Sequence, residues 1–174
     1  MEKIVQEVLF TDSECDTLIN EVSEWTRSLT AYSKDKYSEQ NYDFRNSYEG
    51  IYTLSDSVKT MLINKIGKWN ISDLIPMGRV QRYQTGEYFR KHVDKNKRLF
   101  TDRLKTLTIQ LSNPSDYEGG AFKIYSGTEV TTVDETRGNV VIFDSELKHE
   151  IQDVTSGTRY SFVSWLTGEH ISLW

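Results

Sequence analysis

The stretch that decides the fold runs from Lys105 to Tyr125 and reads KTLTIQLSNPSDYEGGAFKIY. Apolar residues alternate with polar ones at both of its ends, as in β-strands that bury one face. The pairs Asn113-Pro114 and Gly119-Gly120 lie between the two alternating segments and favour turns. Short strands separated by such turn residues are typical of an all-β sandwich or barrel.

The same pattern covers the second half of the chain from Arg79 onward. Turn residues recur at close spacing, for example at Gly86, Gly127 and Gly138-Asn139. We expect strands at Arg79–Tyr83, Tyr88–Val93, Lys105–Leu111, Ala121–Tyr125, Glu129–Val133, Val140–Phe143, Glu150–Val154 and Arg159–Leu166. About eight short strands at this spacing match the strand count of a jelly roll.

The first third of the chain has helical periodicity after one initial strand, expected at Ile4–Phe10. Thr11 followed by Glu14 is the signature of a capping box. The first apolar stripe at helical spacing comprises Leu18, Ile19, Val22, Trp25 and Leu29. A second stripe runs from about Asp56 to Trp69. We expect one α+β, mainly β domain over residues 1–174, with two helices in residues 1–75 packed on the major sheet of a jelly-roll core at 76–168.

Composition indicates a globular protein whose core needs neither disulfides nor a structural metal. The chain has 174 residues, of which 37% are hydrophobic and 27% are charged. No apolar run approaches the roughly 20 residues of a membrane helix, and Met1–Glu7 lacks the apolar stretch of a signal peptide. The single cysteine, Cys15, favours a reducing cytoplasm. A net charge of -5 without a block of lysine and arginine argues against a protein that mainly binds nucleic acid.

Two of the histidines lie where they can bind a metal ion. His92 and Asp94 are two residues apart at the end of an expected strand, so their side chains point to the same side. His149 follows the apolar run Val140–Phe143 and precedes another strand. Two imidazoles and one carboxylate leave three positions of an octahedron open, which suits ferrous iron that binds a chelating co-substrate and then oxygen. A zinc hydrolase with one open water position uses similar ligands, and a surface His-x-Asp pair without function is the simplest alternative.

Arg159 is a candidate anion ligand, because it follows His149 by ten residues (159 − 149) within an otherwise apolar strand. A buried arginine needs a negative partner, and its planar guanidinium matches a carboxylate. An internal acidic residue is the alternative partner. Tyr83 is a second candidate, since its hydroxyl can donate to a carboxylate, although the ring alone can serve the core.

Three polar residues of the expected Lys105–Leu111 strand share one face, namely Thr106, Thr108 and Gln110. Thr108 and Gln110 are therefore candidate cofactor contacts on the inner face of the barrel, unless this face meets water. Trp165 either borders the substrate opening or closes the core.

Several ordered motifs resemble the prolyl 4-hydroxylase-like Fe(II) and 2-oxoglutarate-dependent dioxygenases. The segment Arg82–Asp94, with Tyr83 and Gly86 ahead of His92-Val93-Asp94, is similar to the first iron-binding segment of that family. Further similar segments are Phe44–Ser47, Leu107–Phe122, Gly138–Phe143, Lys148–Ile151, Gly157–Tyr160 and Trp165. The chain departs from the family pattern at Asp153, where many relatives carry proline, and at Gln110, where many carry tyrosine.

The resemblance implies a double-stranded β-helix that uses Fe(II), 2-oxoglutarate and O2, with ascorbate as an optional further cofactor. It implies that His92, Asp94 and His149 hold the iron, while Arg159 binds the far carboxylate of 2-oxoglutarate with Tyr83 as a supporting contact. The implied reaction decarboxylates 2-oxoglutarate to succinate and hydroxylates a C–H bond.

A proline in a peptide or protein is the substrate that this resemblance favours, with Trp165 and Arg45 as candidate substrate contacts. We expect the segments Thr30–Tyr52 and Asp94–Asp102 to border the pocket. The same scaffold could instead hydroxylate a free amino acid, a small molecule or a nucleobase, and the last would need a basic groove with stacking aromatic residues. A non-catalytic jelly-roll binding module is the alternative from another class.

Overall fold

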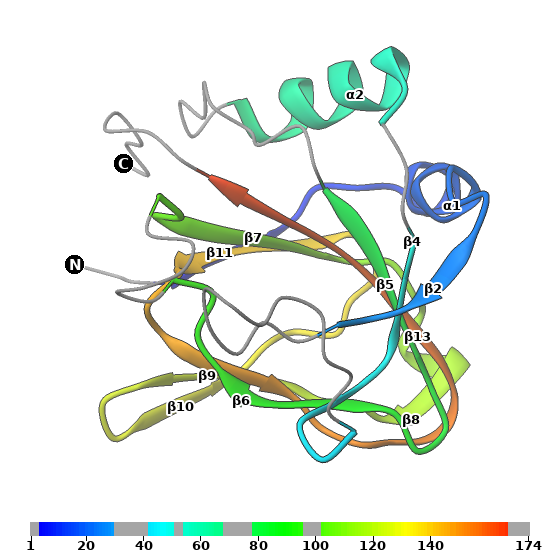
Figure 1. The fold of residues 1–174 in the computed structure, drawn as a ribbon. Helices are drawn as coiled ribbons and strands as arrows, with labels where there is room; N and C mark the ends of the chain where they lie inside the picture. The colour runs from blue at the N-terminus through cyan, green and yellow to red at the C-terminus, as the bar shows by residue number, and fades with distance from the viewer. Residues whose placement is uncertain (1–3, 30–41, 51–53, 68–77, 96–101, 167–174) are drawn as a thin grey trace.

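The computed structural model describes residues 4–29, 42–50, 54–67, 78–95 and 102–166, and within them the chain folds into two facing β-sheets with two helices outside (Figure 1). The paired strands in both sheets are antiparallel. This confirms the predicted jelly-roll class, a mainly β fold.

The major sheet contains eight strands, of which seven follow the order β1-β11-β7-β13-β5-β4-β2 and the eighth, β8, pairs with β13. Their bounds are β1 (Ile4–Val8), β2 (Trp25–Arg27), β4 (Tyr48–Gly50), β5 (Arg79–Gln84), β7 (Lys105–Gln110), β8 (Tyr117–Gly119), β11 (Asn139–Asp144) and β13 (Val154–Leu166). Strand neighbours are therefore mostly distant in sequence. The long strand β13 contacts three partners: β5, β7 and β8.

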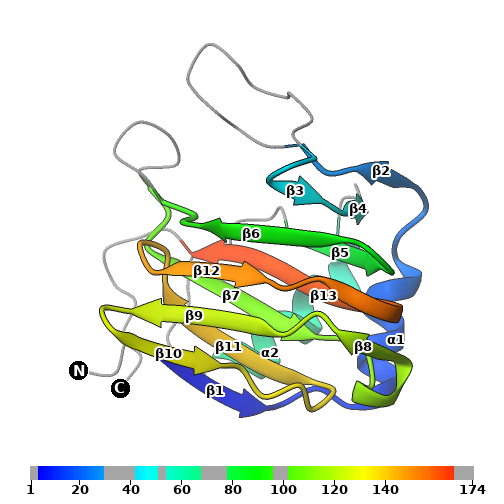
Figure 2. The same ribbon diagram turned by 90° about the horizontal axis from the view of Figure 1, so that it is seen from below.

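The minor sheet has five strands in the order β10-β9-β12-β6-β3. Their bounds are β3 (Arg45–Asn46), β6 (Tyr88–His92), β9 (Phe122–Ser126), β10 (Glu129–Thr132) and β12 (Lys148–Ile151), and a short 3-10 helix, η2 (Pro114–Asp116), precedes β8. Figure 2 shows β6, β12, β9 and β10 as one layer in front of the major sheet. The space between the two sheets holds the candidate site.

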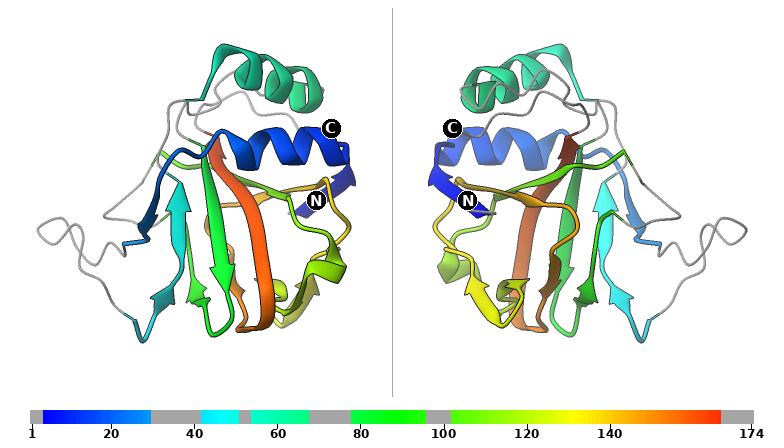
Figure 3. Two further views of the ribbon diagram at one scale, coloured as in Figure 1. Left: turned by 90° about the vertical axis from the view of Figure 1, so that its right-hand side faces the viewer. Right: turned by 90° about the vertical axis from the view of Figure 1, so that its left-hand side faces the viewer.

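Both helices cover the outer face of the major sheet, as predicted (Figure 3). The first, α1 (Asp12–Asn20), begins with the expected capping box: Glu14 accepts from Thr11 N at 2.8 Å, and Thr11 Oγ1 accepts from Glu14 N at 3.4 Å. The second, α2 (Asp56–Ile66), is capped by Ser55. Within the described ranges, no helix has both the length and the apolarity to cross a membrane.

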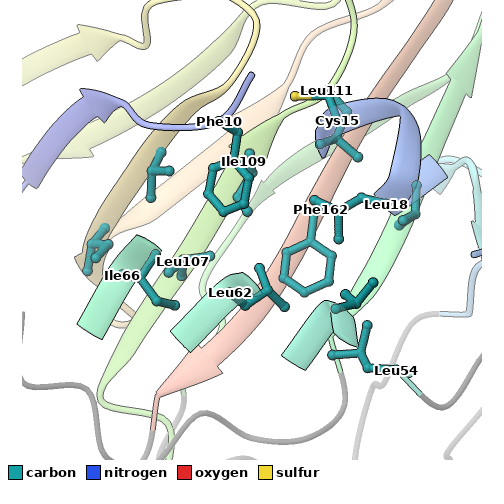
Figure 4. Close-up of a cluster of buried hydrophobic side chains, with 14 of the residues drawn as sticks. Phe10, Cys15, Leu18, Leu54, Leu62, Ile66, Leu107, Ile109, Leu111 and Phe162 are labelled. Carbon is teal, nitrogen blue, oxygen red and sulfur yellow. The ribbon is translucent and has the colours of Figure 1, made fainter. Parts of the chain in front are cut away.

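The main apolar core lies between the helices and the major sheet (Figure 4). Alternation along each strand assigns its residues to two layers. In β7, Leu107 and Ile109 belong to the same buried cluster as Leu18 and Leu62 of the helices (Figure 4). In β11, the residues that face the helices are Val140 and Ile142, whereas Val141 and Phe143 belong to a second cluster between the sheets. Because β11 is covered on both faces, its sequence reads as a continuous apolar run rather than as an alternating one.

The predicted extent of the first helix is wrong. The helix ends at Asn20, and Trp25 lies in strand β2, which pairs with β4. The Trp25 ring packs against Tyr160, with ring centroids 5.7 Å apart, and Arg82 lies over it at 4.9 Å. Strand pairing and these ring contacts override the helical spacing of the apolar residues.

Other boundaries differ from the predicted ones because short strands carry little sequence signal. Strands β2, β3, β4 and β8 have two or three residues each and were not predicted. The predicted strand Glu150–Val154 is split between β12, which begins at Lys148, and β13, which begins at Val154. The described part of α2 ends at Ile66, and Trp69 lies outside the described residues.

Candidate metal centre

Two neighbouring strands of the minor sheet bring the predicted metal ligands together. His92 of β6 and His149 of β12 are directly opposite each other in the antiparallel register, and Asp94 follows the end of β6. One ligand atom from each of the three side chains lies within 4.8 Å of the other two. The nearer Asp94 oxygens are 3.8 Å from His92 Nε2 and 3.4 Å from His149 Nε2. The three side chains thus surround a point at which one ion can bind.

An irregularity in β6 sets the orientation of His92. His149 and Ile151 are two residues apart in β12, but their partners His92 and Phe89 are three apart in β6. The additional residue forms a β-bulge, so that Phe89 and His92 both face the space between the sheets. Their rings stack with centroids 3.5 Å apart. Strict alternation would have placed Phe89 on the opposite face, which is why the sequence did not predict it as a site residue.

Backbone carbonyls select the tautomer of both imidazoles. His92 Nδ1 lies 2.8 Å from the carbonyl oxygen of Arg90, and His149 Nδ1 lies 2.9 Å from that of Leu147. Because a carbonyl can only accept, each Nδ1 carries a hydrogen, which leaves each Nε2 as the nitrogen that can bind a metal ion. Thr106 Oγ1 donates to Asp94 Oδ2 at 2.7 Å and holds the carboxylate in place.

The charges of the three groups are interdependent. Burial and the neighbouring His149 lower the pKa of His92 to about 3. Burial opposes the charged form of His149, but the Asp94 carboxylate outweighs it and raises the pKa of His149. Burial alone would raise the pKa of Asp94, yet the two histidines hold it below its usual range. A bound cation would therefore replace the proton on His149 as the partner of Asp94.

This donor set fits ferrous iron. Two neutral imidazole nitrogens and one carboxylate converge from one side, and each donor is oriented by a hydrogen bond to the surrounding protein. Phe122 and Phe143 contact the His149 ring edge-on, with centroids 6.0 Å and 4.9 Å away. The aromatic surroundings limit contact of this side of the site with water.

A cavity of about 730 Å³ lies between the sheets, with the three metal ligands in its wall. Arg159 of β13 lines the same cavity and is 4% exposed. Its Nε has no hydrogen-bond partner, and its Nη1 is 3.5 Å from Ser161 Oγ. Among the residues that the structure describes, no aspartate or glutamate forms an ion pair with Arg159. The guanidinium is therefore a buried cation that is available to an anion in the cavity.

The predicted cofactor contacts Tyr83, Thr108 and Gln110 all line this cavity. Tyr83 is paired with Arg159 in register, and its ring centroid is 6.0 Å from the guanidinium. Burial raises the pKa of Tyr83, so the phenol is neutral. Thr108 is paired with Val163, and Gln110 with Ser161. The strand register places Gln110, Tyr83 and Arg159 toward one end of the cavity and Thr106 toward the metal ligands.

The predicted substrate contacts Trp165 and Arg45 also line the cavity. Trp165 is paired with Thr106, and the Arg103 guanidinium lies 3.7 Å over its ring. Arg45 lies 4.3 Å over the Phe89 ring, which places it beside the metal site.

Three cavity-lining residues, Glu49, Arg79 and Gln81, and the neighbouring Tyr117 were not predicted from the sequence. Arg45 Nη2 donates to Gln81 Oε1 at 2.7 Å, and Arg79 Nη1 donates to Glu49 Oε1 at 2.8 Å, so these side chains form a polar wall. Tyr117 stands behind the wall and accepts from Gln110 Nε2 at 3.0 Å. Its position directly before the Glu118-Gly119-Gly120 turn was the only sequence signal for it.

One of the two departures from the family pattern, Asp153, has a local partner. Asp153, in place of proline, makes two contacts with Arg90, at 2.6 Å and 3.2 Å, which link β6 to the start of β13.

Of the expected pocket borders, residues 30–41, 51–52 and 96–101 lie outside the described residues. Leu29 and Phe44, which flank the first of these ranges, line the cavity.

Comparison with known sequences gives one family. The family model described as 2OG-Fe(II) oxygenase superfamily matches residues 78–167. A PKHD-type hydroxylase of Psychrobacter sp. (strain PRwf-1) is 34% identical over 91 residues, which are 48% of this chain and 35% of that protein. A PKHD-type hydroxylase of Synechococcus sp. (strain CC9605) is 29% identical over 143 residues, 79% of this chain and 64% of that protein. The chain thus spans less than two thirds of the length of these relatives.

Solved structures with the same fold include two complexes. A prolyl hydroxylase from Trichoplax adhaerens, in complex with a hypoxia inducible factor peptide fragment, aligns with a TM-score of 0.74 at 16% identity, over 95% of this chain and 83% of that one. The viral collagen prolyl hydroxylase of Paramecium Bursaria Chlorella virus-1, a 2OG complex, gives a TM-score of 0.63 at 21% identity, over 97% of both chains. These similarities establish the fold.

Proposed function

The chain belongs to the 2OG-Fe(II) oxygenase superfamily, and on that basis we propose that it is an Fe(II)- and 2-oxoglutarate-dependent dioxygenase that hydroxylates proline in a peptide or protein. One observation carries the proposal: a single cavity combines His92, Asp94 and His149 within 4.8 Å with the buried, unpaired cation of Arg159. A metal ion alone gives no role to Arg159. A co-substrate that chelates the ion and ends in a carboxylate accounts for both features.

The reaction follows from what each side chain does. When bound, iron and 2-oxoglutarate supply the oxidising chemistry, in which 2-oxoglutarate and O2 give succinate and CO2 and a substrate C–H bond becomes C–OH. His92 and His149 present Nε2 because their Nδ1 hydrogens are held by backbone carbonyls, and Thr106 keeps the Asp94 carboxylate turned toward the same point. These three side chains would hold the iron and would leave coordination positions for the co-substrate and O2.

Arg159 is the proposed anchor for the distal carboxylate of 2-oxoglutarate. Its guanidinium can donate two parallel hydrogen bonds to a carboxylate, and the neutral Tyr83 phenol beside it can add a third. Thr108 and Gln110 belong to the polar lining of the co-substrate region in this proposal. Holding the far carboxylate limits the angles at which the chelating end can approach the metal.

Proline in a peptide or protein is supported as the substrate by the names of the relatives and by the peptide complex of one structural neighbour. Trp165 and Arg45, beside the metal ligands in the cavity wall, are the proposed substrate contacts. Residues 1–75 and 76–168 would act as support and catalytic core of one domain. The reducing cytoplasm is the proposed compartment, which agrees with the free, buried thiol of Cys15.

Anaerobic titration with Fe(II) and then 2-oxoglutarate tests the proposal directly. We expect a weak visible charge-transfer band in the wild type and none in His149→Ala. Lys148→Ala is the matched control, because this neighbouring side chain is exposed on the same strand, and it should keep the band.

Turnover is then measured as succinate formation with proline-containing peptides. Peptide-dependent succinate and hydroxyproline in equal amounts would support the substrate assignment. A folded wild-type protein that gives no charge-transfer band would refute the oxygenase proposal and leave a zinc site or a non-catalytic binding module.

A further inference from the structure

The side chain of Gln110 has no donor left for an anion. Its Nε2 donates to the carbonyl oxygen of Ser112 at 3.2 Å and to Tyr117 Oη at 3.0 Å. Because a carbonyl oxygen can only accept, the Ser112 contact fixes which end of the amide is nitrogen. Both hydrogens of the amide are therefore engaged, and Gln110 points one of them at the hydroxyl of Tyr117.

The hydroxyl of Tyr117 accepts the hydrogen bond from Gln110 and retains its own hydrogen. The Arg159 side chain lies close to the Tyr117 ring, because a Cβ placed on Gly120 would be 3.2 Å from Arg159 Cδ and 3.5 Å from Tyr117 Cε2. Among the described residues, no acceptor is within hydrogen-bonding distance of the Tyr117 O–H. Burial raises the pKa of Tyr117, so the hydrogen stays in place at neutral pH. A neutral donor without an acceptor, held between two cavity-lining side chains, is incomplete without a ligand.

We propose that Tyr117 is a further co-substrate ligand, whose O–H donates to the carboxylate that Arg159 binds, while Gln110 acts as its positioning residue. The proposal rests on the proposed function. It assigns a role to the glutamine at position 110, where many relatives carry tyrosine. In this chain the tyrosine hydroxyl belongs to Tyr117 of β8, and the Gln110 amide orients that hydroxyl. It also makes the site selective for 2-oxo acids with a second carboxylate.

The backbone next to this pair is adapted to it. Gly120 has φ +64, and a Cβ at this position would lie 3.2 Å from Arg159 Cδ and 3.5 Å from Tyr117 Cε2, and only 2.9 Å from Val154 Cγ2. A side chain here would clash with Val154 and crowd Arg159, and it would touch the Tyr117 ring. Glycine therefore lets β8 bring Tyr117 close to Arg159.

The test compares two 2-oxo acids of equal chain length by calorimetry, with Mn(II) as the metal and O2 excluded. 2-Oxoglutarate carries the distal carboxylate, and 2-oxopentanoate has a methyl group in its place. The proteins are the wild type, Tyr117→Phe, Gln110→Leu and the double variant. Tyr125→Phe is the matched control, because that hydroxyl already donates to Glu150 at 2.5 Å, and Tyr125 belongs to β9 of the minor sheet, whereas Arg159 belongs to the major sheet.

We expect Tyr117→Phe to weaken 2-oxoglutarate binding about tenfold or more, since one hydrogen bond to a charged group is lost. Binding of 2-oxopentanoate should be unchanged. Gln110→Leu should weaken 2-oxoglutarate binding to a smaller extent, and the double variant should bind like Tyr117→Phe alone, because Gln110 acts through Tyr117.

The outcomes that contradict the inference differ from those that contradict the proposed function. If the wild type binds 2-oxoglutarate and Tyr117→Phe binds it equally well, the inference fails and the oxygenase proposal stands. If Tyr117→Phe weakens both 2-oxo acids alike, Tyr117 has a structural role only. If the wild type with Mn(II) binds no 2-oxoglutarate, the proposed function fails and the inference with it.

Discussion

Replacing Arg159 with methionine should raise the free energy of unfolding of the ligand-free protein while weakening its co-substrate binding. Arg159 is 4% exposed, and its Nε lacks a partner. An unpaired charge removed from bulk water costs several kcal/mol, which water in the cavity reduces. Methionine keeps much of the length of the side chain and removes the charge. We expect the variant to be more stable by about 1–3 kcal/mol without ligand.

The effect of 2-oxoglutarate has the opposite sign. Loss of a bidentate contact between Arg159 and a carboxylate should weaken binding about tenfold or more. At a ligand concentration 100 times the wild-type Kd, the wild type gains about 2.7 kcal/mol of stability. A tenfold weaker variant gains about 1.4 kcal/mol under the same conditions. The stability difference between the two proteins should therefore shrink or reverse.

Urea unfolding with and without Mn(II) and 2-oxoglutarate measures both effects in one experiment. Arg90→Met is the control, because Arg90 is paired with Asp153 on the surface and both effects should be absent. A variant of Arg159 that is less stable without ligand, and that responds to 2-oxoglutarate like the wild type, would refute the reasoning. It would show that Arg159 supports the sheet rather than a ligand.

Three further predictions concern the metal site and the core. Thr106→Val removes the donor to Asp94 and should weaken Fe(II) binding about 10- to 100-fold in an anaerobic titration; unchanged affinity would contradict a supporting role. Fe(II) affinity should fall from about pH 8 to about pH 6, because the raised pKa of His149 means that the ion must displace a proton; a flat profile would argue against this ligand. Burial raises the pKa of Cys15 to about 11 from 9.0, so the thiol of the unfolded chain loses its proton at lower pH than that of the folded chain. The free energy of unfolding should therefore decrease between about pH 9 and pH 11. Urea unfolding at each pH measures this decrease, which should be smaller in Cys15→Ala.

The fold class was predictable because its signals are local and repeated. Alternation in β7 and turn residues such as Gly119-Gly120 recur along the second half of the chain, and each points to a short strand. The short strands at the edges of the sheets were not predictable for a physical reason. Trp25 sits in a three-residue strand whose existence depends on pairing with β4, a contact between residues far apart in the sequence. Propensity over three residues cannot compete with the helical spacing of the neighbouring apolar residues.

The metal ligands were accessible to prediction because two of them are separated by two residues on a strand, a spacing that determines their side. The surroundings of the site depend on features without a local signature. The β6 bulge turns Phe89 inward, and its existence is visible only in the register with β12. Tyr117 reaches Gln110 because β8 pairs with β13, a long-range contact. The metal ligands at the centre of the site could therefore be predicted from the sequence, whereas the residues around them, such as Phe89 and Tyr117, could not.

The direct opposition of His92 and His149 across β6 and β12 makes an ion at this site a crosslink between two strands. The crosslink would close a loop of 57 residues (149 − 92), and closing a loop of that length in advance reduces the entropy of the unfolded chain. Metal binding should therefore stabilise the pairing of β6 with β12 in the minor sheet. In the metal-free protein, amide hydrogens of β6 and β12 should exchange faster than those of β7, which is enclosed on both faces and contributes no metal ligand.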